Sequence, residues 1–220
     1  MDLLNTGLSA VALLVSGTTA WLTLFRRGHV LMTQPTVIFF GLDGGRPPHR
    51  GPKAKVFLRT LLFSPAKRGS LVENMFISLN GETVSQNFNI WVDGDGERLL
   101  RGSGLFVPET GVATNHHFLL PENIERFEFS AGKYQMQVFA KVVGERVPRL
   151  LFSQVLMVTS EIAEGLSKYA GVYFDWSADL AAYTPHLEHP LASLHAVNYL
   201  EDSVLADEQS SRTNARVHRP

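Results

Sequence analysis

The stretch Leu3–Phe25 contains 23 residues and no charged side chain, and Arg26 and Arg27 follow it at once. As an α-helix it would be roughly 34 Å long, enough to cross a hydrocarbon core of about 30 Å. A cleaved signal peptide would need basic residues ahead of the apolar run, whereas only Asp2 lies between that run and the initial methionine. We therefore expect an uncleaved transmembrane anchor over residues 1–27.

The flanking charges predict the orientation of this anchor. Arg26 and Arg27 follow the span, and no Lys or Arg precedes it. Because cytoplasmic flanks carry an excess of Lys and Arg, we expect the N-terminus outside and the rest of the chain in the cytoplasm. The lipid bilayer is then the first expected partner, followed by other membrane or cytoplasmic proteins.

Small residues recur within the span. Ala12, Ser16 and Ala20 are spaced four residues apart. Such a repeat lets two transmembrane helices approach closely, so it predicts a homo-oligomer formed through the helix. The alternative is that small residues are simply common in membrane spans.

Basic residues are concentrated directly after the anchor. Between residues 26 and 68 there are nine Lys or Arg residues and one acidic residue, Asp43. A basic segment near anionic lipid gains of order 1 kcal/mol per charge held at the surface. The residues expected to contact the membrane surface are Arg26, Arg27, Arg46, Arg50, Lys53 and Lys55. The alternative is that they are solvated loop residues.

The composition excludes several classes of protein. The formal net charge is −1, so nothing favours a nucleic-acid partner, and we expect none. The chain has no cysteine, which excludes disulfides, thiolate catalysis and cysteine-ligated zinc. The absence of cysteine agrees with a cytoplasmic domain.

The remainder of the chain alternates as β-strands do. Lys133–Val143 has a period of two over its whole length, and Lys55–Phe63 and Ser85–Val92 have it over shorter runs. Leu71–Leu79 fits a helix or a strand, but the Asn80-Gly81 pair followed by another alternating run favours a hairpin. Seven to nine short strands, with no long amphipathic helix between them, predict an antiparallel β-sandwich.

One motif carries a resemblance to known folds. Gly132-Lys133-Tyr134 is followed by Val138, a turn and the strand Arg149–Val158. This order resembles the final hairpin of immunoglobulin-like and fibronectin type III-like domains, in which a tyrosine near the start of the penultimate strand forms a tyrosine corner. The cysteine pair of true immunoglobulin domains is absent. The resemblance implies an all-β, immunoglobulin-like sandwich and no particular activity.

We divide the chain into four parts. The anchor, residues 1–27, is followed by a basic membrane-proximal segment with the first strand, residues 28–54. The main part of the sandwich is expected over 55–160. Residues 161–220 form a C-terminal extension that is partly helical and disordered at its end.

Three features are expected within that extension. Ser160–Ala170 is predicted to form a short helix, and Pro190 could open a second one. Phe174–Trp176 and Tyr183 are apolar patches that we expect to dock on the sandwich.

Two clusters suggest chemistry and are weighed against simpler interpretations. Asp93 and Asp95 look like the start of a calcium loop, but Gly104 stands where that loop needs a bidentate glutamate. His116 and His117 are adjacent, and in a strand they would point to opposite faces, so they would not readily bind one metal. We assign no catalytic residue, no metal site and no cofactor.

The expected function is therefore that of a single-pass membrane protein whose β-sandwich acts as an interaction or adaptor module. One alternative is a metal-dependent enzyme or binder that uses the two aspartates and two histidines just named. Another is an extracytoplasmic ligand-binding or glycan-binding domain of the opposite orientation, with Trp91 or Trp176 lining a groove.

Overall fold

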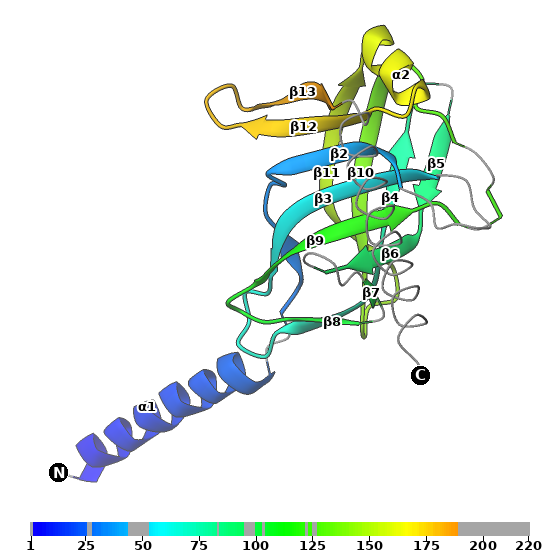
Figure 1. Ribbon diagram of the computed structural model, residues 1–220. Helices are drawn as coiled ribbons and strands as arrows, with labels where there is room; N and C mark the ends of the chain where they lie inside the picture. Colours follow the sequence, from blue (N-terminus) through cyan, green and yellow to red (C-terminus); the bar gives the residue numbers. More distant parts are fainter. Residues whose placement is uncertain are drawn as a thin grey trace, which may run out of the picture.

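The computed structural model describes residues 2–25, 28–43, 53–82, 84–94, 100–102, 104–121, 123–124 and 127–188 (Figure 1). Its helices are α1 (Asp2–Ala20), a π-helical turn (Trp21–Phe25) and α2 (Ser160–Ser167). Its strands are β1 (Leu31–Met32), β2 (Val37–Leu42), β3 (Ala54–Phe63), β4 (Ser70–Asn80), β5 (Ser85–Phe88), β6 (Ile90–Asp93), β7 (Leu100–Arg101), β8 (Leu105–Val107), β9 (Val112–Leu119), β10 (Gly132–Val142), β11 (Arg149–Val158), β12 (Gly171–Ser177) and β13 (Ala182–Glu188).

The N-terminal helix projects away from a β-rich body (Figure 1). The segment Asn5–Thr23 is long and apolar enough to cross a membrane, and none of it is buried inside the protein. Exposed apolar surfaces of this size are typical of sites that contact a membrane or another protein. The length and composition of α1 thus agree with the predicted anchor.

The strands form two antiparallel sheets. Among the described residues, the first sheet has the order β13-β12-β2-β3-β9-β6-β7, with β1 paired to β3. The second has the order β11-β10-β4-β5, with β8 paired to β4. The thirteen strands of the described residues exceed the seven to nine expected, and two of the unpredicted ones, β1 and β7, are only two residues long.

One hydrophobic core draws on both sheets. Val56 and Leu58 of β3 and Met136 and Val138 of β10 are fully buried, as their alternation predicted. Each sheet therefore contributes one apolar face to a shared interior. This arrangement is compatible with a β-sandwich.

The ambiguous segment is a strand, as predicted. Leu71–Leu79 lies within β4, which forms a hairpin with β5 through the pair Asn80 and Ser85. The turn between these residues contains Gly81, whose N–H donates to the Val84 carbonyl at 2.7 Å. The hairpin signal of Asn80-Gly81 outweighed the local helical pattern.

The prediction of one strand over Ser85–Val92 is wrong. β5 pairs with β4 in the second sheet, whereas β6 pairs with β9 in the first, and Asn89 lies between them. A continuous strand would have placed Phe88 and Trp91 on opposite faces, yet both are buried in the core. The alternation of inward and outward side chains holds only within one strand. Because the chain changes sheets at Asn89, the inward positions of β6 do not continue the alternation of β5.

The C-terminal extension contains the predicted helix and a hairpin that the sequence did not predict. Thr159 caps α2 by accepting a hydrogen bond from the Ile162 N–H at 3.2 Å. The apolar patch Phe174–Trp176 belongs to β12, which pairs with β2, and Tyr183 belongs to β13. The two patches are thus part of the first sheet itself.

Tyr134 makes a hydrogen bond to the segment that precedes its own strand. Its ring is buried, and its hydroxyl donates to the Ser130 carbonyl at 2.9 Å, four residues upstream. In sandwich domains this bond ties the connection before a strand to that strand. Here it ties the segment before β10 to the core.

Replacing Tyr134 with phenylalanine should lower the free energy of unfolding by about 1–2 kcal/mol, because the Ser130 carbonyl loses its donor. Denaturant titration of the detergent-solubilised protein measures this loss. The matched control is Tyr169→Phe, since Tyr169 is 61% exposed. Equal stability of the Tyr134→Phe variant and the wild type would contradict a structural role for the bond.

Candidate functional site

A row of aromatic rings crosses the outer face of the first sheet. Its members are direct cross-strand partners on five neighbouring strands. In spatial order they are His186 of β13, Tyr173 of β12, Phe39 of β2, Phe57 of β3 and His117 of β9. We call these five side chains the aromatic row.

The alternation of each strand places the row outside the core. Phe39 lies between the fully buried Ile38 and Phe40, and Phe57 lies between the fully buried Val56 and Leu58. Phe39 and Phe57 are themselves half-buried. The solvent face of an antiparallel sheet is ordinarily polar, so a row of rings there is a departure from the common pattern.

The rings contact one another along most of the row. The ring centroids of Tyr173 and His186 are 5.3 Å apart with nearly parallel planes. Those of Phe39 and Tyr173 are 4.8 Å apart, as are those of Phe57 and His117. These distances lie in the range where aromatic pairs attract each other, so the rings support each other's orientation.

Two glycines make room for the central ring. The ring of Phe39 lies over Gly41 and Gly171, and a Cβ atom at either glycine would overlap it. Close approach of a ring to a strand backbone requires the absence of a side chain at that point. The backbone on both sides therefore fixes the position of Phe39.

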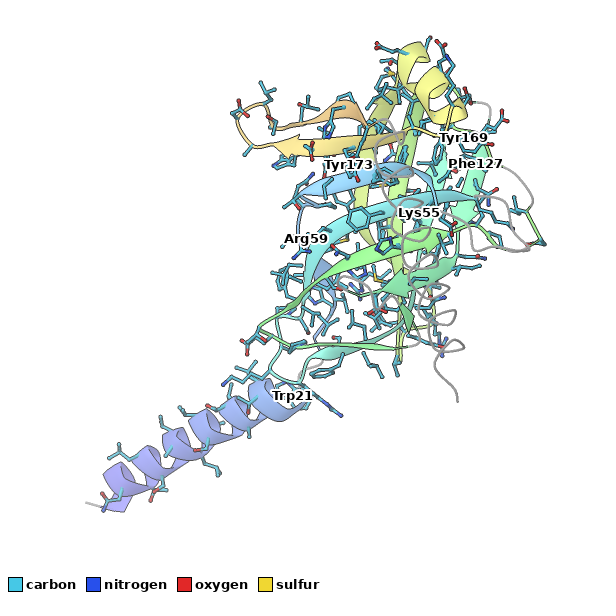
Figure 2. The ribbon with its side chains drawn as sticks, viewed as in Figure 1. Trp21, Lys55, Arg59, Phe127, Tyr169 and Tyr173 are labelled. Atoms are coloured by element: carbon cyan, nitrogen blue, oxygen red, sulfur yellow. The ribbon has the colours of Figure 1, made fainter. Side chains whose placement is uncertain are left out.

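Charged and polar side chains flank the row. Lys55 and Arg59 lie on β3 on either side of Phe57, and Figure 2 labels both, together with Tyr173. The Lys55 ammonium is 5.7 Å from the centroid of the Phe39 ring, a cation–π distance. Arg59 donates to the Asn115 side-chain oxygen at 3.0 Å. The face thus combines aromatic surface with two cations.

Partial burial changes the ionisation of the row. Burial lowers the pKa of Lys55, and the nearby Asp43 opposes that change. Burial, and then the charge of Lys55, lower the pKa of His117 to about 4. Burial raises the pKa of Tyr173, with Glu188 as the next cause. Near neutral pH, His117 and Tyr173 are therefore uncharged.

The predicted pair His116 and His117 is split by the sheet, as the sequence indicated. His117 belongs to the aromatic row, whereas His116 is fully buried and its Nδ1 accepts a hydrogen bond from the Trp91 indole at 3.1 Å. Burial raises the pKa of Asp93, which is the cross-strand partner of His116. Asp95 lies outside the described residues. Within the described part of the chain, no group of three His, Cys, Asp or Glu side chains could hold a metal ion.

The basic residues predicted to contact lipid fall into two groups. Arg26, Arg27, Arg46 and Arg50 lie outside the described residues. Lys53 donates to the Ile124 carbonyl at 3.0 Å, and Lys55 lies beside Phe39. Lys53 directly precedes β3 and Lys55 lies near its start, whereas the end of β3 is the part that pairs with β1, next to the anchor. Lipid contact by these six residues stays a prediction, as does self-association through Ala12, Ser16 and Ala20.

A hollow of about 540 Å³ lies between α2 and the segment before β10, and its lining includes Lys53, Phe127 and Tyr169, the last two labelled in Figure 2. Tyr169 has a φ of 67°, which is rare for a residue with a side chain. Its N–H donates to the Leu166 carbonyl at 3.2 Å, so this conformation ends α2 in the manner usually reserved for glycine. The end of the helix therefore accounts for the unusual backbone conformation of Tyr169, and no bound ligand is needed to explain it.

Comparisons with protein-family models, with characterised proteins and with solved structures each found no match. The aromatic row therefore rests on its own geometry. Sequence reasoning missed it because alternation places Phe39 and Phe57 on outer faces but does not align them. The alignment comes from the register between strands, and β12 and β13 were not predicted as strands.

Proposed function

We propose that this chain is a single-pass membrane protein that presents an immunoglobulin-like β-sandwich in the cytoplasm, where the aromatic row binds a partner protein. The aromatic row is the observation that carries the proposal. The anchor, the fold and the binding face are each supported by separate features.

The anchor is supported by the chemistry of α1. Its apolar side chains from Leu8 to Val15 are exposed, and the hydroxyls of Thr18 and Thr19 donate to the Leu14 and Val15 carbonyls at 2.8 Å. Because these hydroxyl groups are hydrogen-bonded within the helix, they need no hydrogen-bond partner from the lipid. The orientation rests on Arg26 and Arg27, because cationic flanks favour the cytoplasmic side.

The immunoglobulin-like topology is supported by the order of the strands. Named A to G in chain order as β2, β3, β4, β6, β9, β10 and β11, with β5 as C′, the first sheet contains A-B-E-D and the second contains G-F-C-C′. Immunoglobulin-like sandwiches use these same two groupings. The hydrogen bond of Tyr134 to Ser130 supports the same assignment.

Protein binding is supported by the composition of the row. Protein interfaces are enriched in aromatic side chains and arginine, and rigid rings lose little conformational entropy on binding. The row supplies five rings held by mutual contacts, and Arg59 lies beside them, itself exposed. Lys55 adds a second cation, and Asp175 lies 2.8 Å from His186, so charges of both signs flank the rings.

A glycan is the second candidate ligand, since rings flanked by Arg59, Asn115 and Asp175 also suit a polar ring-shaped ligand. The specific expectation that Trp91 lines a groove is wrong, because Trp91 is 2% exposed and packs in the core. Trp176 is half-buried and contacts Tyr183, with ring centroids 5.2 Å apart.

The test is a photo-reactive phenylalanine analogue introduced at Tyr173 of the full-length chain in its native membranes. We expect a cross-linked protein adduct that disappears when Phe57→Ser is added, because Phe57 lies in the same row. The matched control places the analogue at Tyr169, which is exposed and lies outside the row, at the end of α2. An equal adduct from Tyr169, or none from Tyr173, would reject the proposal. An adduct removed by glycosidases would favour the glycan.

A further inference from the structure

A second exposed apolar surface lies at the end of the β-rich body next to α1. It consists of Leu71 on β4, Phe106 on β8, and Val143 and Val147 in the turn between β10 and β11. These side chains are between 45% and 71% exposed. We call these four side chains the membrane-end surface, and Figure 1 shows β8 close to the end of α1.

Three of these side chains, Leu71, Phe106 and Val143, form one continuous patch, and Val147 lies in the same turn as Val143. Leu71 and Phe106 are cross-strand partners, and the Val143 N–H donates to the Leu71 carbonyl at 2.9 Å. Leu71, Phe106 and Val143 all line one hollow of about 410 Å³. Their neighbours Val72 and Val107 are fully buried, so alternation directs Leu71 and Phe106 outward. The outward direction of Leu71 and Phe106 is therefore set by the pairing of β4 with β8.

Chain connectivity holds this patch near the end of α1. Gly28 lines the same hollow, and a Cβ atom at Gly28 would overlap the side chains of Ser64 and Ala66. Gly28 follows Phe25, the last residue of the π-helical turn, by three residues. Three residues reach at most about 11 Å, so the body cannot move far from the helix end. A bilayer crossed by α1 would lie directly against this patch.

Cationic side chains adjoin the apolar ones. Lys67, Arg68 and Arg146 are exposed at this end of the body, and Arg68 lines the hollow itself. Glu145 is engaged by Arg149 at 2.7 Å, and Glu73 and Glu109 are exposed acidic residues of the described part of the chain at this end of the body. Apolar side chains with Lys and Arg beside them suit an anionic lipid surface, even with a few acidic residues nearby.

We propose that the membrane-end surface rests in the headgroup layer of the bilayer, with Phe106 and its apolar neighbours directed toward the acyl chains and Lys67, Arg68 and Arg146 beside anionic headgroups. The inference rests on the membrane anchorage in the proposed function. The exposed indole of Trp21 lies near the end of the helix. Because tryptophan prefers the membrane–water boundary, Trp21 supports placing this end of the helix at that boundary. Contact with lipid would fix the orientation of the body, and so the direction in which the aromatic row faces.

The absence of cysteine allows single-cysteine spin labels to test this in the full-length chain. The protein is reconstituted into vesicles of phosphatidylcholine and phosphatidylserine, with a label at Phe106→Cys. We expect this label to be accessible to oxygen and to lose contact with a water-soluble nickel chelate. Leu180→Cys is the matched control, because Leu180 is an equally apolar residue, 66% exposed, in the turn between β12 and β13.

A third label at Leu14→Cys in α1 separates two kinds of failure. If Leu14 is in lipid and Phe106 is as water-accessible as Leu180, the membrane-end surface is rejected while the anchor stands. If Leu14 itself is water-accessible, the anchor is rejected and this inference with it.

In the supporting case, Lys67→Gln with Arg68→Gln should make the Phe106 label shallower in these vesicles but not in pure phosphatidylcholine. An equal change in both lipids would reject the role of the two cations.

Discussion

Replacing Phe40 with alanine is expected to lower the free energy of unfolding by about 3–5 kcal/mol. Phe40 is fully buried, and its ring centroid lies 5.0 Å from that of Phe129, 5.2 Å from that of Phe174 and 6.4 Å from that of Tyr134. It therefore joins β2, β12, β10 and the segment before β10. Alanine would leave a cavity among three aromatic rings, and these rings cannot all move to fill it.

The neighbouring Phe39 provides a matched control. It is the same residue type on the same strand but faces outward, so Phe39→Ala should cost only about 1 kcal/mol. The same change should abolish the cross-link from the aromatic row, which Phe40→Ala should affect only through unfolding. Denaturant titration of the detergent-solubilised protein, followed by tryptophan fluorescence, measures both losses. Equal losses for the two variants would contradict the assignment of the two faces.

Acidification from about pH 7 to about pH 5 is expected to destabilise the protein, with His116 contributing about 2 kcal/mol of the loss. Burial, and then the charge of His117, lower the pKa of His116 to about 4. The unfolded chain, with a pKa of about 6.5, binds a proton in this range while the folded chain does not. Stability from His116 is therefore present above about pH 6.5 and is lost as the pH falls toward 4.

His116→Gln isolates this contribution. Glutamine does not titrate, yet its side-chain oxygen still offers an acceptor to the Trp91 indole, which now bonds to Nδ1. Asp93, the cross-strand partner, has a raised pKa and changes stability in the opposite direction at lower pH, and it is unchanged in the variant. Unfolding titrations at both pH values should show a shallower loss in the variant. The same slope in both proteins would contradict a neutral, buried His116.

The two exposed faces of this protein have different origins in the sequence. The membrane-end surface depends on Phe106 and Leu71, whose outward direction follows from the buried Val107 and Val72 beside them. The aromatic row depends on pairing across five strands, from His117 of β9 to His186 of β13. Those partners are separated by long stretches of chain, and no local pattern states which strands are neighbours.

The sequence by itself determined the apolar helix, the strand character of Leu71–Leu79 and the inward face of Lys133–Val143. Each follows from local rules: an uncharged run, a turn pair and a period of two. Only the tertiary structure decided that the chain changes sheets at Asn89 and that β12 joins β2. The physical reason is that backbone hydrogen bonds between strands are non-local, so sheet order and register depend on how all faces share one core.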